Sequence, residues 1–491
     1  MQTQKLDEQL ALQLIPPLWK TRVQSTEQFG SFETIDWIDP QLLAEIGQIK
    51  RFIERWKADR EFRKQVAIDP YNACVLYGLK VNPEDIRPKW DKNFASSSEE
   101  QIAEQFPLLK LFDQFYDQHL ERAVDVGIPI SSSANSHFWA WRERQIARVG
   151  SQVKAYVHRE ISHFTNAFEL SKGCSVGCRF CGVAAPRLND IFIYNPENAK
   201  LWREVLENMT SILGSAFQGS FCYWATDPFD NPDYEKFCAD YYAITKVFPQ
   251  TTTAQALKNP ERTRAFLEFS KKKNSLFNRF SILSLKMFEQ IHQEFSPEEL
   301  LTVKLVLLND EAEDIKAHTG RQRERNLQEG IADKELPDQG TIACVSGFLF
   351  NMVERSVKLI SPCNANERWP LGYIVYDQGT FTNADELNNL IERMIRDNMP
   401  LTVRPYDLMR FREDLKYENL SDGFQLANKV KTFKFVNDPY WSDLGKMIYE
   451  GNKTAEQITQ LLAAQGVLSD QTSYYLNVLF ERGVLDSEPK P

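Results

Sequence analysis

The residues best suited to chemistry are three cysteines on one short loop. The segment Gly173–Gly182 reads GCSVGCRFCG, so Cys174, Cys178 and Cys181 follow the spacing C-x3-C-x2-C. Thiolate is the usual ligand of iron–sulfur clusters, and a loop with these gaps can turn three thiolates onto three irons of a cubane. Because the loop offers three ligands and not four, one iron stays open to an outside chelator. The alternative is a zinc site that a distant His or Cys completes.

The elements around the loop predict where these thiols lie. The run Phe164–Ser171 comes directly before the cysteines and reads as a strand, so the loop is expected at the carboxyl end of that strand. Reactive groups on parallel sheets gather at that edge. Phe180, next to the last cysteine, is expected to cover the cluster or to face an adenine.

From about residue 164 the chain alternates short β-rich runs with helical patterns. This alternation indicates βαβ units, a parallel sheet and right-handed crossovers. Helices are expected at 232–247, 260–272 and 286–295, and strands at 164–171, 220–226, 251–257, 277–285, 303–308, 342–350 and 356–361.

The cysteine motif in this context resembles the radical S-adenosylmethionine superfamily. The resemblance implies an α/β fold, a partial (β/α)6 barrel over about residues 161–400. It implies one [4Fe-4S] cluster on the three cysteines and S-adenosyl-L-methionine on the open iron, bound through its amino and carboxylate groups. An electron from a donor such as flavodoxin or ferredoxin then cleaves the cofactor to a 5′-deoxyadenosyl radical, which removes a hydrogen atom.

Polar residues at later strand ends are the candidates for holding the cofactor. Thr226 and Asp227 end the second strand, where the superfamily often has a glycine-rich stretch with an acidic residue. This chain lacks those glycines, and the alternative is a turn and helix cap. Ser281 and Ser284 on the fourth strand are placed to reach the carboxylate, with core-facing serines as the alternative.

A fourth cysteine is the candidate for hydrogen-atom transfer. Cys363 follows the β-rich run SVKLIS and Pro362, so it is expected at a strand's carboxyl end, where a thiol can face the reacting carbon. The S–H bond is weaker than most C–H bonds, so a thiol readily gives hydrogen to a carbon radical. A packed loop thiol is the alternative. Cys344 is the reserve candidate, although a cysteine inside a predicted strand usually serves as a buried small hydrophobe.

Three segments together resemble the radical S-adenosylmethionine peptide epimerases of proteusin-type natural products. They are CSVGCRFC, YWATDPFDNPDY (223–234) and SPCNANERWPLGY (361–373). The resemblance implies conversion of L- to D-residues in a ribosomally made precursor peptide. The radical takes the α-hydrogen from one face, and a cysteine, best matched by Cys363, returns hydrogen from the other. Peptide crosslinking, C-methylation and a non-catalytic zinc-bearing peptide scaffold are the alternatives.

The flanking regions read as separate modules. Residues 1–160 are mostly helical, and 52–78 resembles the leader domain of Nif-like precursors, with an amphipathic helical pair as the simpler interpretation. Residues 401–435 are expected to be a segment that connects the barrel to the C-terminal module. Residues 436–491 predict three helices with a β end and resemble winged-helix modules that bind leader peptides by β-augmentation. Eight acidic against four basic residues from Val436 onward disfavour the alternative of DNA binding, and a structural cap is the third possibility.

Composition excludes several classes of protein. The chain has 491 residues, 42% hydrophobic and 26% charged, with a net charge of −10, which argues against a general nucleic-acid binder. No apolar run approaches the roughly 20 residues of a membrane span. The N-terminus MQTQKLDEQL does not read as a secretory signal. Eight cysteines in such a chain therefore predict a reducing compartment and a cytoplasmic protein.

Overall fold

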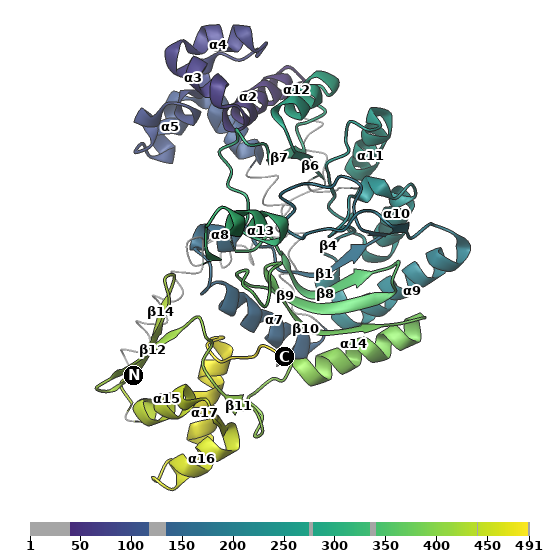
Figure 1. The fold of residues 1–491 in the computed structure, drawn as a ribbon. Coiled ribbons are helices and arrows are strands. Elements are labelled where there is room, and N and C mark those ends of the chain that lie inside the picture. The colour runs from purple at the N-terminus through teal and green to yellow at the C-terminus, as the bar shows by residue number, and fades with distance from the viewer. Residues whose placement is uncertain (1–39, 117–133, 274–277, 334–339, 439, 490–491) are drawn as a thin grey trace. The chain divides into compact units, whose positions relative to one another are not determined.

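The computed structural model describes residues 40–116, 134–273, 278–333, 340–438 and 440–489 (Figure 1). The chain divides after Glu45 into two compact units, and residues 46–491 form the second. Most of the first unit, together with the expectations for residues 1–39, lies outside the described residues.

The described N-terminal region is helical, as the sequence predicts. Phe52 and Phe62 are buried, and their rings meet edge-on with centroids 5.2 Å apart. Asp59 caps α3 by accepting hydrogen bonds from the backbone N–H groups of Glu61 and Phe62. The amphipathic interpretation of 52–78 is thereby confirmed, and its likeness to a leader domain stays a prediction. The elements are α2 (Pro40–Ala58), α3 (Arg60–Ile68), α4 (Pro70–Leu76), η3 (Pro83–Lys89), η4 (Lys92–Phe94), α5 (Glu99–Gln105), α7 (Ser136–Val149) and α8 (Ala155–Glu160).

The middle of the chain is a mixed α/β fold, which confirms the predicted class. Strands and helices alternate from β1 to β8, and asparagine or serine side chains cap several of the helices. The strands are β1 (Phe164–Glu169), β4 (Ser220–Phe221), β5 (Thr252–Thr253), β6 (Asn278–Ile282), β7 (Val303–Leu307) and β8 (Val345–Asn351). The helices are α9 (Pro196–Leu213), α10 (Tyr234–Thr245), α11 (Pro260–Lys272), α12 (Leu285–Glu294), α13 (Gly320–Gln328) and, after the sheet, α14 (Ala384–Asn398), with short η5 (Gly214–Phe217) and η6 (Pro228–Asp230).

Six of these strands run parallel. One sheet has the order β10-β9-β8-β1-β4 and another the order β5-β6-β7. A parallel bridge between Phe221 and Gln250 links the two sheets, so the parallel strands follow the order β8-β1-β4-β5-β6-β7. No pairing joins β7 to β8 in the part of the chain that the structure describes, so the strands do not close into a barrel there.

The last predicted strand is present but runs in the opposite direction. β9 (Ser356–Pro362) pairs antiparallel with β8 through a short turn, and β10 (Tyr373–Thr380) pairs antiparallel with β9. The sequence predicted that 356–361 continues the βαβ series, but four residues cannot hold the crossover helix that a parallel strand needs. The carboxyl end of β9 therefore lies beside the amino end of β8.

The two faces of the five-stranded sheet carry different cores. On the helix-covered face, aromatic and aliphatic side chains pack with α7, α9, α10 and α14 (Figure 1); they include Phe168, Phe348, Phe350, Leu359 and Ile374. The other face, called the inner face below, carries Ala167, Phe221, Val345, Leu349, Ile360 and Tyr373. Neighbouring residues of one strand point to opposite faces, so side chains two residues apart share a face.

The C-terminal region is larger than the sequence predicts. Residues 401–435, expected only to connect, contain β11 (Leu408–Met409), β12 (Lys416–Leu420) and β13 (Gly423–Ala427), and β14 (Thr432–Val436) begins there. β12, β13 and β14 form an antiparallel sheet that shares one hydrophobic core with the three predicted helices. Those elements are α15 (Tyr440–Glu450), β15 (Lys453–Thr454), α16 (Ala455–Ala463) and α17 (Ser469–Glu481).

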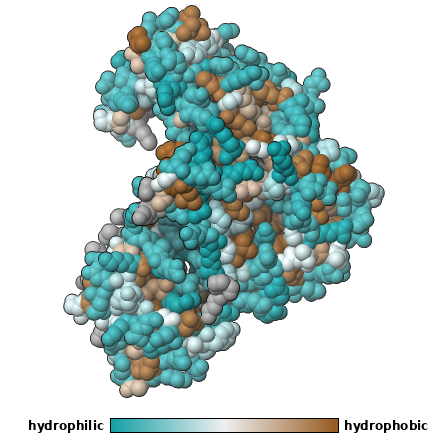
Figure 2. Space-filling model, in the orientation of Figure 1, coloured by the Kyte–Doolittle hydropathy of each residue, from teal (hydrophilic) through white to brown (hydrophobic). Residues whose placement is uncertain are grey.

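The surface carries no long apolar belt in the view of Figure 2, where most residues are hydrophilic and hydrophobic ones gather over several small areas. Among the described helices, none combines the length and apolarity needed to cross a bilayer.

Phe168 tests the helix-covered core. Its ring stacks on Phe350 with centroids 4.7 Å apart and meets the edge of Trp202 at 4.9 Å. Phe168→Ala is expected to destabilise the fold by about 3–5 kcal/mol, because it leaves a cavity among rings. Urea denaturation followed by tryptophan fluorescence measures the effect. Tyr474→Ala, at a position 59% exposed, is the control and should change stability by less than about 0.5 kcal/mol. Equal effects would contradict this core assignment.

Candidate functional site

The cysteine loop lies at the carboxyl end of β1, as predicted. Beyond β1 the chain forms β2 (Ser171–Lys172), which pairs antiparallel with β3 (Asp190–Ile191) and closes the base of the loop. Cys174 forms a bridge with Arg187 inside that base. Gly173 has φ +85°, and a Cβ there would overlap the Arg187 carbonyl, so this entry to the loop requires glycine.

The three loop thiols are partly exposed and lie near one another. The pKa of Cys178 is raised to about 11, mainly by burial and also by the neighbouring Cys181 and Cys174 thiols. Burial also raises the pKa of Cys174, although backbone N–H groups of the loop oppose that effect. Cys181 Sγ accepts a hydrogen bond from the Ala185 N–H at 3.4 Å. Cys174 and Cys178 therefore favour the protonated thiol in the metal-free chain, and a metal must displace those protons to bind.

This donor set fits a cluster of several irons. In the described residues, no three His, Cys, Asp or Glu side chains converge where a single metal ion could sit. Each cysteine of a cubane binds a different iron, so its ligands need not converge on one point. Three soft sulfur donors on one loop suit iron–sulfur ligation.

Asp230 holds the first half of the loop. Its carboxylate is buried and accepts hydrogen bonds from the Ser175 N–H at 2.8 Å, from the Ser175 hydroxyl and from Gln255 Nε2 at 2.8 Å. Ser175 directly follows Cys174. The segment after β4 and the segment after β5 therefore fix the position of the first cysteine.

Arg321 holds the second half of the loop. Its Nη1 donates to the Cys178 carbonyl at 2.9 Å, its Nη2 donates to the Ala185 carbonyl, and its backbone N–H donates to the Cys181 carbonyl at 3.0 Å. Gly320, at φ +52°, packs so closely on the carbonyls of Cys181 and the next residue that a Cβ would overlap them. The start of α13 is thus a clamp on the loop.

The sequence does not identify this clamp, because Arg321, Arg323 and Arg325 lie in the run GRQRER (320–325), which favours a solvated charged surface over a grip on peptide or carboxylate. The three arginines have different partners. Arg323 makes a bidentate pair with Asp333, with both distances 2.8 Å, and Arg325 pairs with Glu329 on the surface. No local spacing distinguishes the arginine that reaches a loop about 140 residues earlier in the chain.

Thr226 and Asp227 are buried at the carboxyl end of β4, where they were expected. Asp227 caps η6 through the Phe229 N–H at 3.0 Å and also accepts from Thr253 Oγ1 at 2.8 Å and from the Ala254 N–H at 2.7 Å. The structure therefore realises the turn-and-cap interpretation, and Asp227 also links the segment after β4 to β5 and the residue that follows it. Contact with a cofactor stays a prediction for both residues.

The other predicted cofactor contacts occupy three different settings. Ser281 lies on β6 between Phe280 and Ile282, which are buried in a cluster with α12. The Ser281 side chain therefore points away from that cluster. Ser284 caps α12, since its hydroxyl accepts from the Met287 N–H at 3.1 Å. Phe180 is buried, and Lys316 Nζ lies 4.8 Å from the centroid of its ring. Their roles toward S-adenosylmethionine stay predictions.

Cys363 does not lie at the edge where it was expected. It follows β9, whose direction places its carboxyl end beside the amino ends of the parallel strands. The side chain is buried in the helix-covered core, where burial raises its pKa to about 12 and the nearby Arg148 guanidinium opposes that rise. Cys363 does directly follow a strand, as predicted, but that strand was expected to run parallel to its neighbours and runs antiparallel to β8. Its role as hydrogen donor stays a prediction.

Cys344 lies on the inner face. It directly precedes β8, its carbonyl accepts from the Phe164 N–H at 2.7 Å, and its side chain packs with the inner-face core. Burial raises the pKa of this thiol to about 11, while the nearby Arg279 guanidinium lowers it. The two candidate donor cysteines therefore face opposite sides of the sheet.

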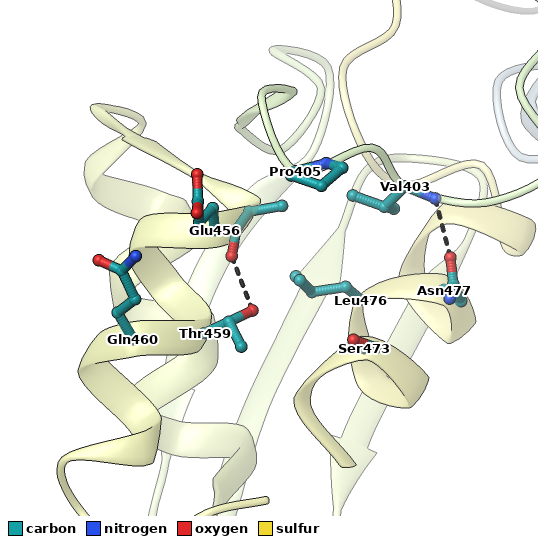
Figure 3. A pocket seen from close by; sticks show the side chains of 9 residues that line it. Val403, Pro405, Glu456, Thr459, Gln460, Ser473, Leu476 and Asn477 are labelled. Atoms are coloured by element: carbon teal, nitrogen blue, oxygen red, sulfur yellow. Dashed lines mark hydrogen bonds between the residues drawn. The ribbon is translucent and has the colours of Figure 1, made fainter. Parts of the chain in front are cut away.

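A pocket of about 340 Å³ lies elsewhere, in the C-terminal region between α16, α17 and residues 403–405 (Figure 3). The Val403 N–H donates to Asn477 Oδ1 at 2.9 Å beside it, and Thr459 lies across from Leu476. Its lining includes none of the site residues predicted from the sequence.

Fold and site define a mixed α/β protein with a three-thiol loop at the carboxyl edge of a parallel sheet. A protein of Sinorhizobium fredii, described as uncharacterized protein y4wI, is 36% identical over 460 residues, which cover 91% of this chain and 89% of that protein. The chain belongs to the same family as that protein.

Two further comparisons add little. No family model matches the sequence. A solved structure, titled crystal structure of BtrN in complex with AdoMet and 2-DOIA, aligns with a TM-score of 0.29 and 11% identity, over 40% of this chain and 72% of that one. A likeness at this level does not define the fold of this chain.

The clamp predicts a loss of cluster binding. Arg321→Ala removes two charge-assisted hydrogen bonds to the cysteine loop, and loss of such supporting bonds typically weakens metal binding at least about tenfold. Iron and acid-labile sulfide per chain, measured after anaerobic reconstitution and competition with a chelator, should fall accordingly. Arg325→Ala on the same helix is the matched control and should retain the cluster. Full retention in Arg321→Ala would show that the clamp is dispensable.

Asp227 predicts a pH dependence of stability. Burial raises its pKa from 3.8 to about 6, although three hydrogen-bond donors oppose the rise. Because the folded-state pKa lies above the unfolded one, its contribution to stability is complete below pH 4 and is lost as pH rises through about 6. Relative to Asp227→Asn, the wild type should lose on the order of 3 kcal/mol over that window and nothing further above it. Denaturation of both proteins across pH 4–8 measures this difference, and a constant difference would refute the assignment.

Proposed function

We propose that this protein is a radical S-adenosylmethionine enzyme that converts L-residues to D-residues in a ribosomally made precursor peptide. The observation that carries the first part is the loop of Cys174, Cys178 and Cys181, held between Asp230 and Arg321 at the carboxyl edge of parallel strands. The resemblance of the segments 223–234 and 361–373 to the proteusin-type epimerases supports the second part.

The chain's own residues would supply position and a hydrogen donor. When bound to the three thiols, an open [4Fe-4S] cluster with S-adenosylmethionine supplies a radical that removes a hydrogen atom. A thiol on another side of the substrate would then return a hydrogen atom to the α-carbon. This would leave a thiyl radical on the cysteine, which one electron from a donor such as flavodoxin or ferredoxin and one proton would restore to the thiol. Because removal and return use different groups, the D-product no longer presents its hydrogen to the radical, which makes the inversion irreversible.

The donor is one of two cysteines. The resemblance favours Cys363, whereas the side-chain directions favour Cys344, because the latter shares the inner face with Tyr223, Trp224 and Tyr373. Cys363 lies behind the sheet from that face, beside Arg148. For Cys363 to act, its loop would have to turn the thiol to the other side.

The C-terminal region is proposed to bind the leader of the precursor. β14 is an edge strand of the sheet β12-β13-β14, and an extended peptide adds to such an edge through backbone hydrogen bonds. Tyr475 of α17 donates to Asp438, two residues beyond β14, so the third helix lies next to that strand. The excess of acidic residues in this region disfavours nucleic acid as the partner.

All eight cysteines are free thiols in the structure. This state suits the proposed cytoplasmic setting, where thiols stay reduced and an electron donor such as flavodoxin or ferredoxin is at hand.

The test is epimerisation in D2O with two single variants. Wild type should place deuterium at the α-carbon of new D-residues, because a thiol exchanges its hydrogen with solvent, and should form 5′-deoxyadenosine. If Cys344 is the donor, as its side-chain direction favours, Cys344→Ala is the impaired variant; if Cys363 is the donor, as the resemblance favours, it is Cys363→Ala. The impaired variant should still form deoxyadenosine but lose at least about 99% of D-residue formation, because a reactive group is missing. The other variant is its control. Inversion at the wild-type rate by both variants would refute hydrogen return from either cysteine.

Product mass separates the alternatives. Epimerisation in H2O leaves the peptide mass unchanged, whereas crosslinking loses two hydrogens and methylation adds a methylene. A protein that binds zinc and no iron would instead support a non-catalytic peptide scaffold.

A further inference from the structure

Two cations lie side by side on β6 and β7. Arg279 of β6 pairs in register with Lys304 of β7. Their neighbours Phe280, Ile282 and Leu305 belong to a buried cluster with α12. Strand alternation therefore directs Arg279 and Lys304 to the opposite face of these strands, away from that helix.

Nothing in the described part of the chain neutralises this pair. The Arg279 side chain has no hydrogen bond or ion pair there, and its Nε atom is buried without an acceptor. Lys304 has no ion pair with a described residue either. The residue is exposed to solvent, and partial desolvation of its ammonium and the nearby Arg279 guanidinium lower its pKa. Like charges directly opposite each other on adjacent strands destabilise a sheet, and an unpaired buried donor adds to the cost. An anion between the two side chains would remove both costs.

The surroundings place this pair beside the inner face. Arg279 pairs in register with Thr252 of β5, whose hydroxyl is bonded to that of the inner-face residue Tyr223. The guanidinium also opposes the rise that burial causes in the pKa of Tyr223 and of Cys344. The Tyr223 hydroxyl is itself bonded to Gln250 Oε1 at 2.6 Å and Thr252 Oγ1 at 2.7 Å, so it does not serve as a partner for the guanidinium.

The charged groups near Lys304 do not remove the cationic character of the pair. They are Lys57 and two carboxylates, Glu160 and Asp314, and neither carboxylate reaches ion-pair distance. The pair therefore remains a net positive site on the same side of the strands as a candidate donor thiol.

We propose that Arg279 and Lys304 bind a side-chain carboxylate of the substrate peptide, from an Asp or Glu residue. The guanidinium offers two parallel N–H donors that match a carboxylate, and the ammonium adds a point charge. The proposal rests on the proposed function in that the substrate is a peptide. It would hold an acidic residue beside Cys344 and so define which part of the precursor is presented for inversion. The carboxylate of S-adenosylmethionine is the other source of the same chemistry.

The experiment uses the reconstituted full chain and two fluorescent octapeptides, N-acetylated and C-terminally amidated, that differ only by Glu or Gln at one position. Wild type should bind the Glu peptide about tenfold more tightly, as expected for a charge-assisted bond, and salt should reduce the preference. Arg279→Gln and Lys304→Gln should each remove most of it, whereas Arg279→Lys should keep part of it. Lys272→Gln, on the surface of α11, is the control and should preserve it.

Parallel titration with S-adenosylmethionine alone distinguishes the two sources of carboxylate. The proposal predicts unchanged affinity for the cofactor in both Gln variants. A loss of cofactor affinity, or equal affinity of wild type for the Glu and Gln peptides, would overturn it. A wild type that prefers the Glu peptide but forms neither deoxyadenosine nor D-residues would refute the proposed function and leave the carboxylate site standing. Circular dichroism of each variant confirms that it is folded.

Discussion

The cysteine loop depends on two charged side chains that come from distant parts of the chain. Asp230 binds its first half and Arg321 its second half, and each does so largely through the loop backbone. A loop cannot satisfy its own peptide groups as a helix does, so outside donors and acceptors decide its shape. The position of the three thiols is therefore set by the segments after β4 and β7, and not by the loop sequence alone.

The direction of each strand has a comparable effect on the rest of the site. The parallel strands bring the cysteine loop, Asp227 and Asp230 to one edge of the sheet. The reversal at β9 places Cys363 at the amino edge of the parallel strands, where Cys344 also lies because it directly precedes β8. The two thiols differ in face, since Cys363 is buried in the helix-covered core and Cys344 packs on the inner face.

Much of this arrangement could be predicted from the sequence, because the signals are local. Cysteine spacing, the strand before it, the alternation of strands and helices and the three C-terminal helices each depend on residues within about 20 positions of one another. The turn and cap at Asp227 was likewise readable from its Asp-Pro pair. The features that could not be predicted depend on contacts between residues that lie far apart in the sequence. Arg321 looks like its two neighbours until the loop that it binds is placed beside it, and β12–β14 became recognisable as part of the C-terminal region only through their shared core.

The proposed chemistry requires that Cys174, Cys178 and Cys181 hold a cluster with one open iron. Electron paramagnetic resonance of the reconstituted and reduced protein, recorded with and without S-adenosylmethionine, is the decisive measurement. We expect a [4Fe-4S]⁺ signal whose g values shift when S-adenosylmethionine is added, because the added molecule binds the open iron. A protein that holds zinc instead of iron, or a signal that the cofactor leaves unchanged, would contradict it.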